Sequence, residues 1–142
     1  MDDRTFKHPR AERFKDLIVW QRARQLTQRI YKATRSGTFL ADRSLASQLQ
    51  RCCVSIKANI AEGFGRRGLG EFGHFLSMSL GSSLEAKSRL YVALDCGYLQ
   101  EEEMKALYQE AEEIRRMLKS LLRNTARMNV KRPQMTRTDA VE

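Results

Sequence analysis

The chain has 142 residues, of which 42% are hydrophobic and 30% are charged, a balance typical of one folded globular domain and not of a disordered segment. No apolar run approaches the roughly 20 residues that a membrane-spanning helix needs. The charged start, MDDRTFKHPR, has no apolar signal region, and three irregularly spaced cysteines suggest no disulfide framework. We therefore expect a cytoplasmic protein that has no membrane partner.

The net charge of +9 and the isoelectric point near 9.9 are the strongest compositional features. The surplus lies in the first two predicted helices, in a segment rich in glycine and arginine, and in the two tails. Such a surplus favours a polyanionic partner, RNA or DNA, because Lys and Arg neutralise phosphates. The alternative is a basic surface that binds nothing.

The first predicted helix covers 16–35, where apolar residues recur at intervals of three and four. The second covers 43–62 and has two apolar faces, the larger of which is expected to face the core. Its smaller face consists of Val54, Ala58 and Ala61. A helix with two apolar faces usually contacts two neighbours, so these three residues form our candidate oligomer interface.

The third predicted helix covers 70–95 and the fourth covers 100–125, each with apolar residues on one face. Lys87 falls inside the apolar arc of the third helix, which is inconsistent with a wholly apolar face. The expected core residues of the third helix are Phe72, Phe75, Leu76, Leu80, Leu84, Leu90, Tyr91 and Leu94.

Four amphipathic helices with short connections predict an all-α fold, an antiparallel up-down-up-down four-helix bundle. We place the bundle at 14–125. A flexible N-terminal segment is expected at 1–13 and a disordered basic tail at 126–142, where apolar periodicity is lost.

The sequence offers little support for catalysis or for a metal site. Glu71 and His74 have the spacing used in di-iron bundles, but that site needs a second such pair and two further carboxylates. Cys52 and Cys53 lie on the apolar side of their helix and are interpreted as core residues. We predict no catalytic residue, no metal and no cofactor.

The segment NIAEGFGRRG joins the second and third predicted helices. Its glycines suit a tight turn, and it lacks the Lys-Ser/Thr ending of a nucleotide-binding loop. We hypothesise that Asn59 and Glu62 brace this turn around Gly63 and Gly65, because free carbonyl and N–H groups at a helix end need partners. The brace would then set the direction of the two arginines that follow, residues 66 and 67.

Basic residues on the outer faces of the helices and in this turn are the candidate phosphate contacts. No aromatic stripe lies among them, so stacking of single-stranded bases is not indicated. The candidates are Arg22, Arg29, Lys32, Arg66, Arg67, Arg116, Lys119 and Arg123.

Four segments together resemble the 23S rRNA-intervening-sequence protein family of bacterial four-helix bundles. They are FKDLIVWQRA (14–23), QLQRCCVSIKANIAEGFGRR (48–67), EFGHFLSMSLGSSLEA (71–86) and GYL (97–99). The resemblance implies a non-enzymatic bundle that assembles into a ring-like homopentamer with basic surfaces. Relatives include an accessory protein of diversity-generating retroelements, which binds a reverse transcriptase and nucleic acid.

The chain departs from this family's pattern at Lys57, where proline is usual, and at Lys87, where an acidic residue is common. The first linker, SGTFLADRS, also lacks the usual Phe-Pro and acidic cluster. We expect a non-catalytic, oligomeric nucleic-acid-binding or ribonucleoprotein-accessory protein. The alternative is a protein-docking scaffold, such as an accessory subunit that binds a reverse transcriptase.

Overall fold

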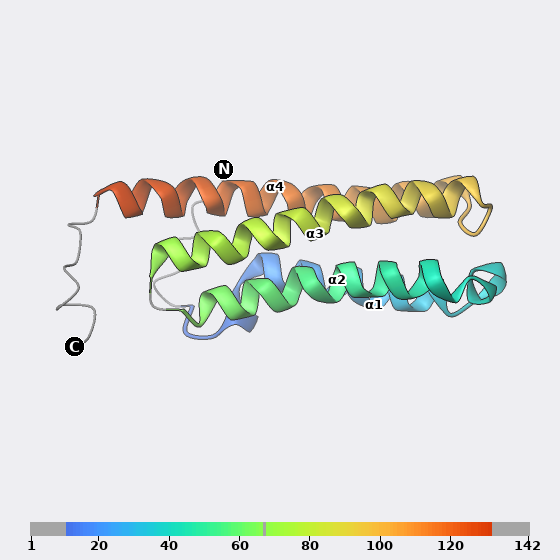
Figure 1. Ribbon diagram of the computed structural model, residues 1–142, viewed down its shortest axis with the longest axis horizontal. Helices are drawn as coiled ribbons and strands as arrows, with labels where there is room; N and C mark the ends of the chain where they lie inside the picture. The colour runs from blue at the N-terminus through green and yellow to red at the C-terminus, as the bar shows by residue number, and fades with distance from the viewer. Residues whose placement is uncertain (1–10, 67, 132–142) are drawn as a thin grey trace.

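A computed structural model of the chain describes residues 11–66 and 68–131, apart from the side chains of residues 128–131. Its long helices are α1 (Ile18–Thr34), α2 (Arg43–Phe64), α3 (Leu69–Asp95) and α4 (Glu101–Lys131). Short 3-10 helices, η2 (Phe14–Asp16) and η3 (Gly37–Ala41), precede α1 and α2. The helices run alternately up and down along one long axis, which confirms the predicted all-α four-helix bundle (Figure 1).

Asp42 forms hydrogen bonds to two elements at one end of the bundle. One of its carboxylate oxygens accepts the backbone N–H of Leu45 at 3.0 Å, which caps α2 as an N-terminal acceptor should. The other oxygen accepts the Tyr98 hydroxyl at 3.0 Å, so the α3–α4 connection is joined to the start of α2. Gly97 just beyond α3 has φ +77°, the left-handed conformation that favours glycine at the end of a helix.

The core is a single apolar cluster to which all four helices contribute. Cys52 and Cys53 are buried in it, as predicted, and neither forms a disulfide. No helix within residues 11–66 and 68–131 is both long enough and apolar enough to cross a membrane. The largest fully buried side chains include Leu26, Ile30, Leu49, Ile56, Ile60, Leu76, Leu90, Leu107, Ile114, Leu118 and Leu121.

The buried face of α3 differs from the predicted one. Leu84 and Tyr91 are each 50% exposed, so their assignment to the core is wrong. The residues that face the core are largely small, which lets the backbones of neighbouring helices approach closely. The Ser79 hydroxyl even donates to the Ile56 carbonyl of α2 at 2.7 Å. The buried residues of α3 are Leu76, Ser79, Ser83, Ala86, Leu90 and Ala93.

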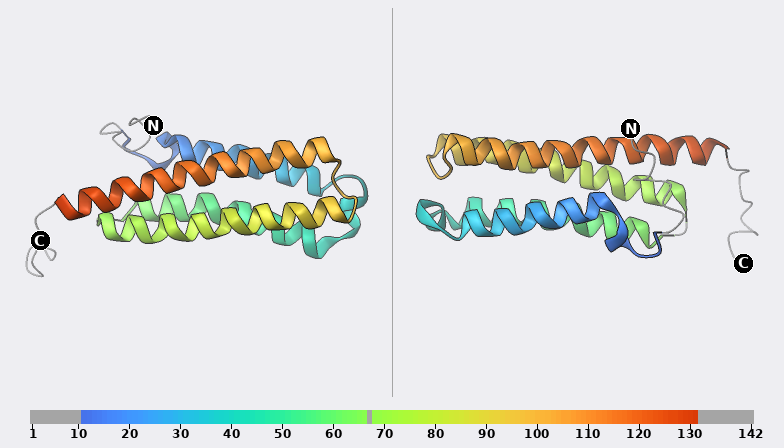
Figure 2. Two further views of the ribbon diagram at one scale, coloured as in Figure 1. Left: turned by 90° about the horizontal axis from the view of Figure 1, so that it is seen from above. Right: turned by 180° about the vertical axis from the view of Figure 1, so that it is seen from behind.

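α4 is longer than predicted, because it continues to Lys131 and does not end near residue 125. The expected disordered tail is therefore helical over 126–131, while residues 132–142 lie outside the described chain. Most of the predicted N-terminal segment, residues 1–10, also lies outside it. The end of α4 projects past the α2–α3 turn, as the views in Figure 2 show.

Candidate nucleic-acid interface

The predicted turn motif is built differently from our hypothesis. α2 continues through Gly63 to Phe64, so Asn59 and Glu62 lie within the helix. The Asn59 amide donates to the carbonyl and the hydroxyl of Ser55, one turn earlier, at 2.9 and 3.0 Å. The Asn59 side chain thus forms hydrogen bonds within α2. These contacts do not brace the turn, which corrects that part of the hypothesis.

Gly63 and Gly65 also serve α2 in different ways. Gly63 is buried where α2 meets α3, and a Cβ atom there would lie 2.6 Å from the Cβ of Phe75 and 3.0 Å from the ring of Phe72. Gly65 ends the helix with an ordinary φ of −73°. Gly63 is therefore required by close helix packing, and neither glycine is required by a left-handed backbone.

Arg66 is held against the end of the bundle. Its guanidinium pairs with the Glu62 carboxylate at 2.6 Å and lies 5.3 Å from the centre of the Phe75 ring. Glu62 thus orients the first arginine of the turn, although by pairing with it and not by bracing the backbone. Arg67 lies outside the described residues.

The two arginine candidates of α1 are engaged with acidic residues of α4. Arg22 pairs with Glu113 at 3.0 Å, and Arg29 pairs with Glu110. The second oxygen of Glu110 is buried without a partner beside a cavity of about 10 Å³, roughly the size that one water needs. Arg22 and Arg29 therefore form ion pairs between α1 and α4 and are less available to phosphates than the sequence alone indicates.

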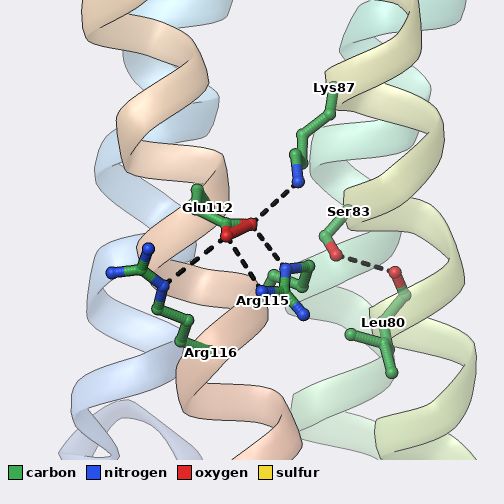
Figure 3. Close-up of polar contacts among 6 residues, drawn as sticks. All are labelled: Leu80, Ser83, Lys87, Glu112, Arg115 and Arg116. Atoms are coloured by element: carbon green, nitrogen blue, oxygen red, sulfur yellow. Dashed lines mark hydrogen bonds and ion pairs between the residues drawn. The ribbon is translucent and has the colours of Figure 1, made fainter.

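A cluster of charged side chains lies where α3 packs against α4. Glu112 accepts from Lys87 at 2.8 Å, pairs with Arg115, and lies 3.5 Å from Arg116 (Figure 3). The side chains of Lys87 and Glu112 are only 14% and 15% exposed. Hydrogen bonds from Arg115 and then Lys87 lower the pKa of Glu112 to about 2, so its carboxylate is ionised at neutral pH.

This Glu112 cluster (Lys87, Glu112, Arg115 and Arg116) explains the lysine in the apolar arc of α3. A buried ammonium needs a carboxylate partner, and Glu112 supplies it from the facing helix. Lys57, the other departure from the family pattern, is half-buried on α2, and nothing in the described contacts explains it.

The two halves of α4 carry opposite charge. The first half, Glu101–Glu113, has six acidic residues and one lysine. From Ile114 to Lys131 the helix has no acidic residue and six basic ones. The six cations are Arg115, Arg116, Lys119, Arg123, Arg127 and Lys131. From Arg116 to Arg127 they lie three or four residues apart, a spacing that keeps neighbouring side chains close on one side of a helix.

The structure thus separates the predicted phosphate contacts into two groups. Arg22, Arg29 and Arg66 each have a carboxylate partner at short range, and Arg116 lies 3.5 Å from Glu112, which it shares with Lys87 and Arg115. Lys119 and Arg123 are exposed, and no carboxylate of the described residues lies within 4.0 Å of either. Lys32 on α1 is likewise exposed and has no such partner within the described chain, but it is distant in sequence from the α4 group.

Two features of this region were missed by sequence reasoning. One is the participation of Lys87 and Arg115, for which the spacing of Glu112, Arg115 and Arg116 on one helix was an available signal. The other is a groove of about 400 Å³ between α3 and α4, where Tyr91 and Tyr108 meet. This groove forms only when α3 packs against α4 in the folded chain, so no local sequence pattern predicts it.

The remaining sites have simpler surroundings. Burial raises the pKa of the Cys53 thiol to about 12, which disfavours the nucleophilic thiolate. Glu71 and His74 are exposed, and no three His, Cys, Asp or Glu residues within the described ranges are placed to hold a metal ion. On the outer side of α2, Val54 is 37% exposed, Ala58 is exposed and Ala61 is half-buried.

Comparison with known proteins assigns the chain to a protein family. The family model described as 23S rRNA-intervening sequence protein matches residues 15–120. A solved structure from Bacteroides thetaiotaomicron VPI-5482, described as a protein with unknown function from the S23 ribosomal protein family, superposes with a TM-score of 0.68. It shares 22% identity, and the match covers 74% of this chain and 98% of that one. The comparison with curated proteins found no match. The chain therefore belongs to the 23S rRNA-intervening sequence protein family.

Proposed function

We propose that this protein is a non-catalytic nucleic-acid-binding protein whose phosphate contacts lie on the basic half of α4. The observation that carries the proposal is the absence of any acidic residue from Ile114 to Lys131, against six basic residues. Phosphate contacts supply most of the affinity of sequence-independent binding. The first contacts we assign are Arg116, Lys119 and Arg123.

The pairing of the other cations supports this location. Arg22 and Arg29 would have to give up Glu113 and Glu110 before they could bind a phosphate with full charge. Arg116 lies on the edge of the Glu112 cluster, where the single carboxylate of Glu112 is shared by Lys87, Arg115 and Arg116. A net positive charge therefore remains there. The binding surface therefore includes Arg116 together with its neighbours on α4.

The assembly we propose is a homo-oligomer, with a pentamer favoured by the family resemblance. Each subunit would add one copy of the α4 surface, so a long polyanion could engage several copies at once. Linked contacts raise the overall affinity well above that of one copy.

Charge reversal tests the proposal against a matched control. The Lys119→Glu/Arg123→Glu variant should bind RNA and DNA oligonucleotides about tenfold more weakly or worse, because two phosphate contacts become repulsive. The Arg24→Glu/Arg43→Glu variant changes net charge equally at exposed positions outside α4 and should bind within about threefold of the wild type. Equal losses in the two variants would mean that net charge, and not this surface, controls binding.

A protein-docking scaffold, such as an accessory subunit for a reverse transcriptase, is the second candidate. Exposed apolar side chains on the outer faces of α2 and α3 favour it, namely Val54, Met78 and Leu84. An apolar interface persists at high salt, whereas phosphate binding weakens steeply as salt rises. Binding to a protein partner that survives added salt, together with no binding of oligonucleotides, would favour the scaffold.

A further inference from the structure

The groove between α3 and α4 is lined by two tyrosines and is partly open to solvent. Tyr91 and Tyr108 meet edge to face, with ring centroids 5.4 Å apart and an angle of 69° between the rings. Leu94 and Met104 add apolar surface, and Gln109 adds an amide, within a volume of about 400 Å³. Apolar pockets of this size with a few polar groups commonly hold small ligands.

This groove is continuous with the Glu112 cluster. The Lys87 ammonium lies 4.9 Å from the centre of the Tyr108 ring and 2.8 Å from the Glu112 carboxylate. Glu112 in turn contacts Arg115 and Arg116 (Figure 3). The cluster contains three cations and one carboxylate, so it presents a surplus of positive charge beside the aromatic groove.

We propose that the groove holds an unpaired base of a single-stranded nucleic acid whose phosphates lie on the cations of Arg116 and Lys119. The inference rests on the proposed function and adds the class of ligand. A base has an aromatic face that stacks on tyrosine without much regard to sequence, and polar edges that an amide or a hydroxyl can meet. In a duplex the faces of the bases are stacked on one another and are not available to the groove.

The charges around the groove fix which part of a nucleotide enters it. Glu101 lines the groove and pairs with Lys105 at 3.3 Å, and two more acidic residues follow at 102 and 103. These carboxylates repel a phosphate at that end, whereas the Glu112 cluster attracts one at the other end. A strand therefore places its uncharged base against the exposed ring of Tyr91 and its backbone toward the basic half of α4.

Binding of three ligands of equal length tests the inference: a single strand of one repeated base, the same backbone without bases, and a duplex. Wild-type protein should prefer the single strand. Tyr91→Ser should weaken binding of that strand by between about 5-fold and about 150-fold, the range for loss of one stacked base, and should leave the abasic backbone unaffected. Tyr91 is 50% exposed, so the substitution should preserve the fold, which the melting temperature checks.

Val92→Ser is the matched control, because Val92 is 45% exposed on the same helix and does not line the groove. It should bind all three ligands as the wild type does. As a second readout, a strand carrying a photoreactive thiouracil should cross-link to the peptide that contains Tyr91 or Tyr108.

The outcomes separate this inference from the proposed function. If the abasic backbone binds as tightly as the single strand, or Tyr91→Ser changes neither, the base pocket is overturned and phosphate binding stands. A preference for the duplex also overturns the base pocket. If none of the three ligands binds the wild type, both the proposed function and the base pocket are wrong.

Discussion

At the scale of single residues, Gly63 sets how closely α2 approaches α3. A Cβ atom at this position would meet the Cβ of Phe75 at 2.6 Å, and that atom is fixed by the backbone of α3. Gly81 is also a helical glycine, but nothing lies within 4 Å of the Cβ that it would gain. A comparison of the two positions therefore separates the effect of close packing on stability from the effect of the low helix propensity of glycine.

Gly63→Ala should lower the free energy of unfolding by about 1–3 kcal/mol, the usual cost of overpacking. Gly81→Ala should raise it by up to about 1 kcal/mol, since alanine is the better helix former. Urea unfolding of both variants measures the difference. A Gly63→Ala protein as stable as Gly81→Ala would contradict the packing argument.

Glu112 couples the stability of the fold to acidic pH. Its pKa is lowered to about 2 in the folded state from an ordinary value of 4.5, so ionised Glu112 stabilises the fold. That contribution is fully present above about pH 5 and is lost as the pH falls through the interval from 4.5 toward 2. The loss follows because the unfolded chain takes up the proton first.

Glu112→Gln should lower the free energy of unfolding at neutral pH by about 1.5–3 kcal/mol, typical of hydrogen bonds to charged groups. The difference from wild type should shrink at about pH 2.5. Glu113→Gln, which removes the charge of the half-exposed partner of Arg22, is the matched control and should cost less than about 1 kcal/mol. A Glu112→Gln deficit that is unchanged by acid would show that ionised Glu112 is not what stabilises the fold.

At the scale of helices, the sequence predicts α1, α2 and the start of α4 well because large apolar residues repeat on one face of each. α3 is less predictable, since its buried face contains Ser79, Ser83 and Ala93, and large residues such as Leu84 and Tyr91 lie outside. Small residues are buried there because backbones approach closely, which is a property of the packed pair and not of one helix.

The candidate site was predictable only in part for the same reason. Arg116, Lys119 and Arg123 are among the phosphate contacts predicted from the sequence, where the acid-free run from Ile114 to Lys131 can also be read directly. The pairing of Arg22 with Glu113 joins residues 91 positions apart, and it depends on how α1 and α4 align along the bundle. The residue pattern of one helix says nothing about how two helices align. The sequence therefore does not show which arginines pair with a carboxylate and which are free to bind a phosphate.

At the scale of the whole molecule, the partly exposed apolar strip of Val54, Ala58 and Ala61 predicts self-association. Light scattering should give a multiple of the 16.5 kDa chain mass, with five copies favoured. Ala58→Glu should lower that mass, because a carboxylate would be buried without a partner. Ser44→Glu, exposed near the start of the same helix, should leave it unchanged. A wild-type mass of one chain at working concentration would contradict the prediction.

The charge on the molecule is divided along α4, so the end of this helix that projects past the α2–α3 turn is basic (Figure 2). The opposite end of α4 begins with Glu101, Glu102 and Glu103. Both signs suit the helix dipole, which favours acids near the first turn and bases near the last. The dipole accounts for charges near the two ends, and Arg115 and Arg116 pair with Glu112. Lys119 has neither explanation among the described residues, which is consistent with a phosphate contact.

The salt dependence of nucleic-acid affinity tests the central claim most directly. For a single strand, the slope of log affinity against log salt falls by about 0.7 for each phosphate contact that is lost. The Lys119→Gln/Arg123→Gln variant should therefore show a slope shallower than that of the wild type by about 1.4 for each subunit engaged. The Arg24→Gln/Arg43→Gln variant should keep the wild-type slope. Equal slopes in the wild type and the Lys119→Gln/Arg123→Gln variant would contradict phosphate binding by α4.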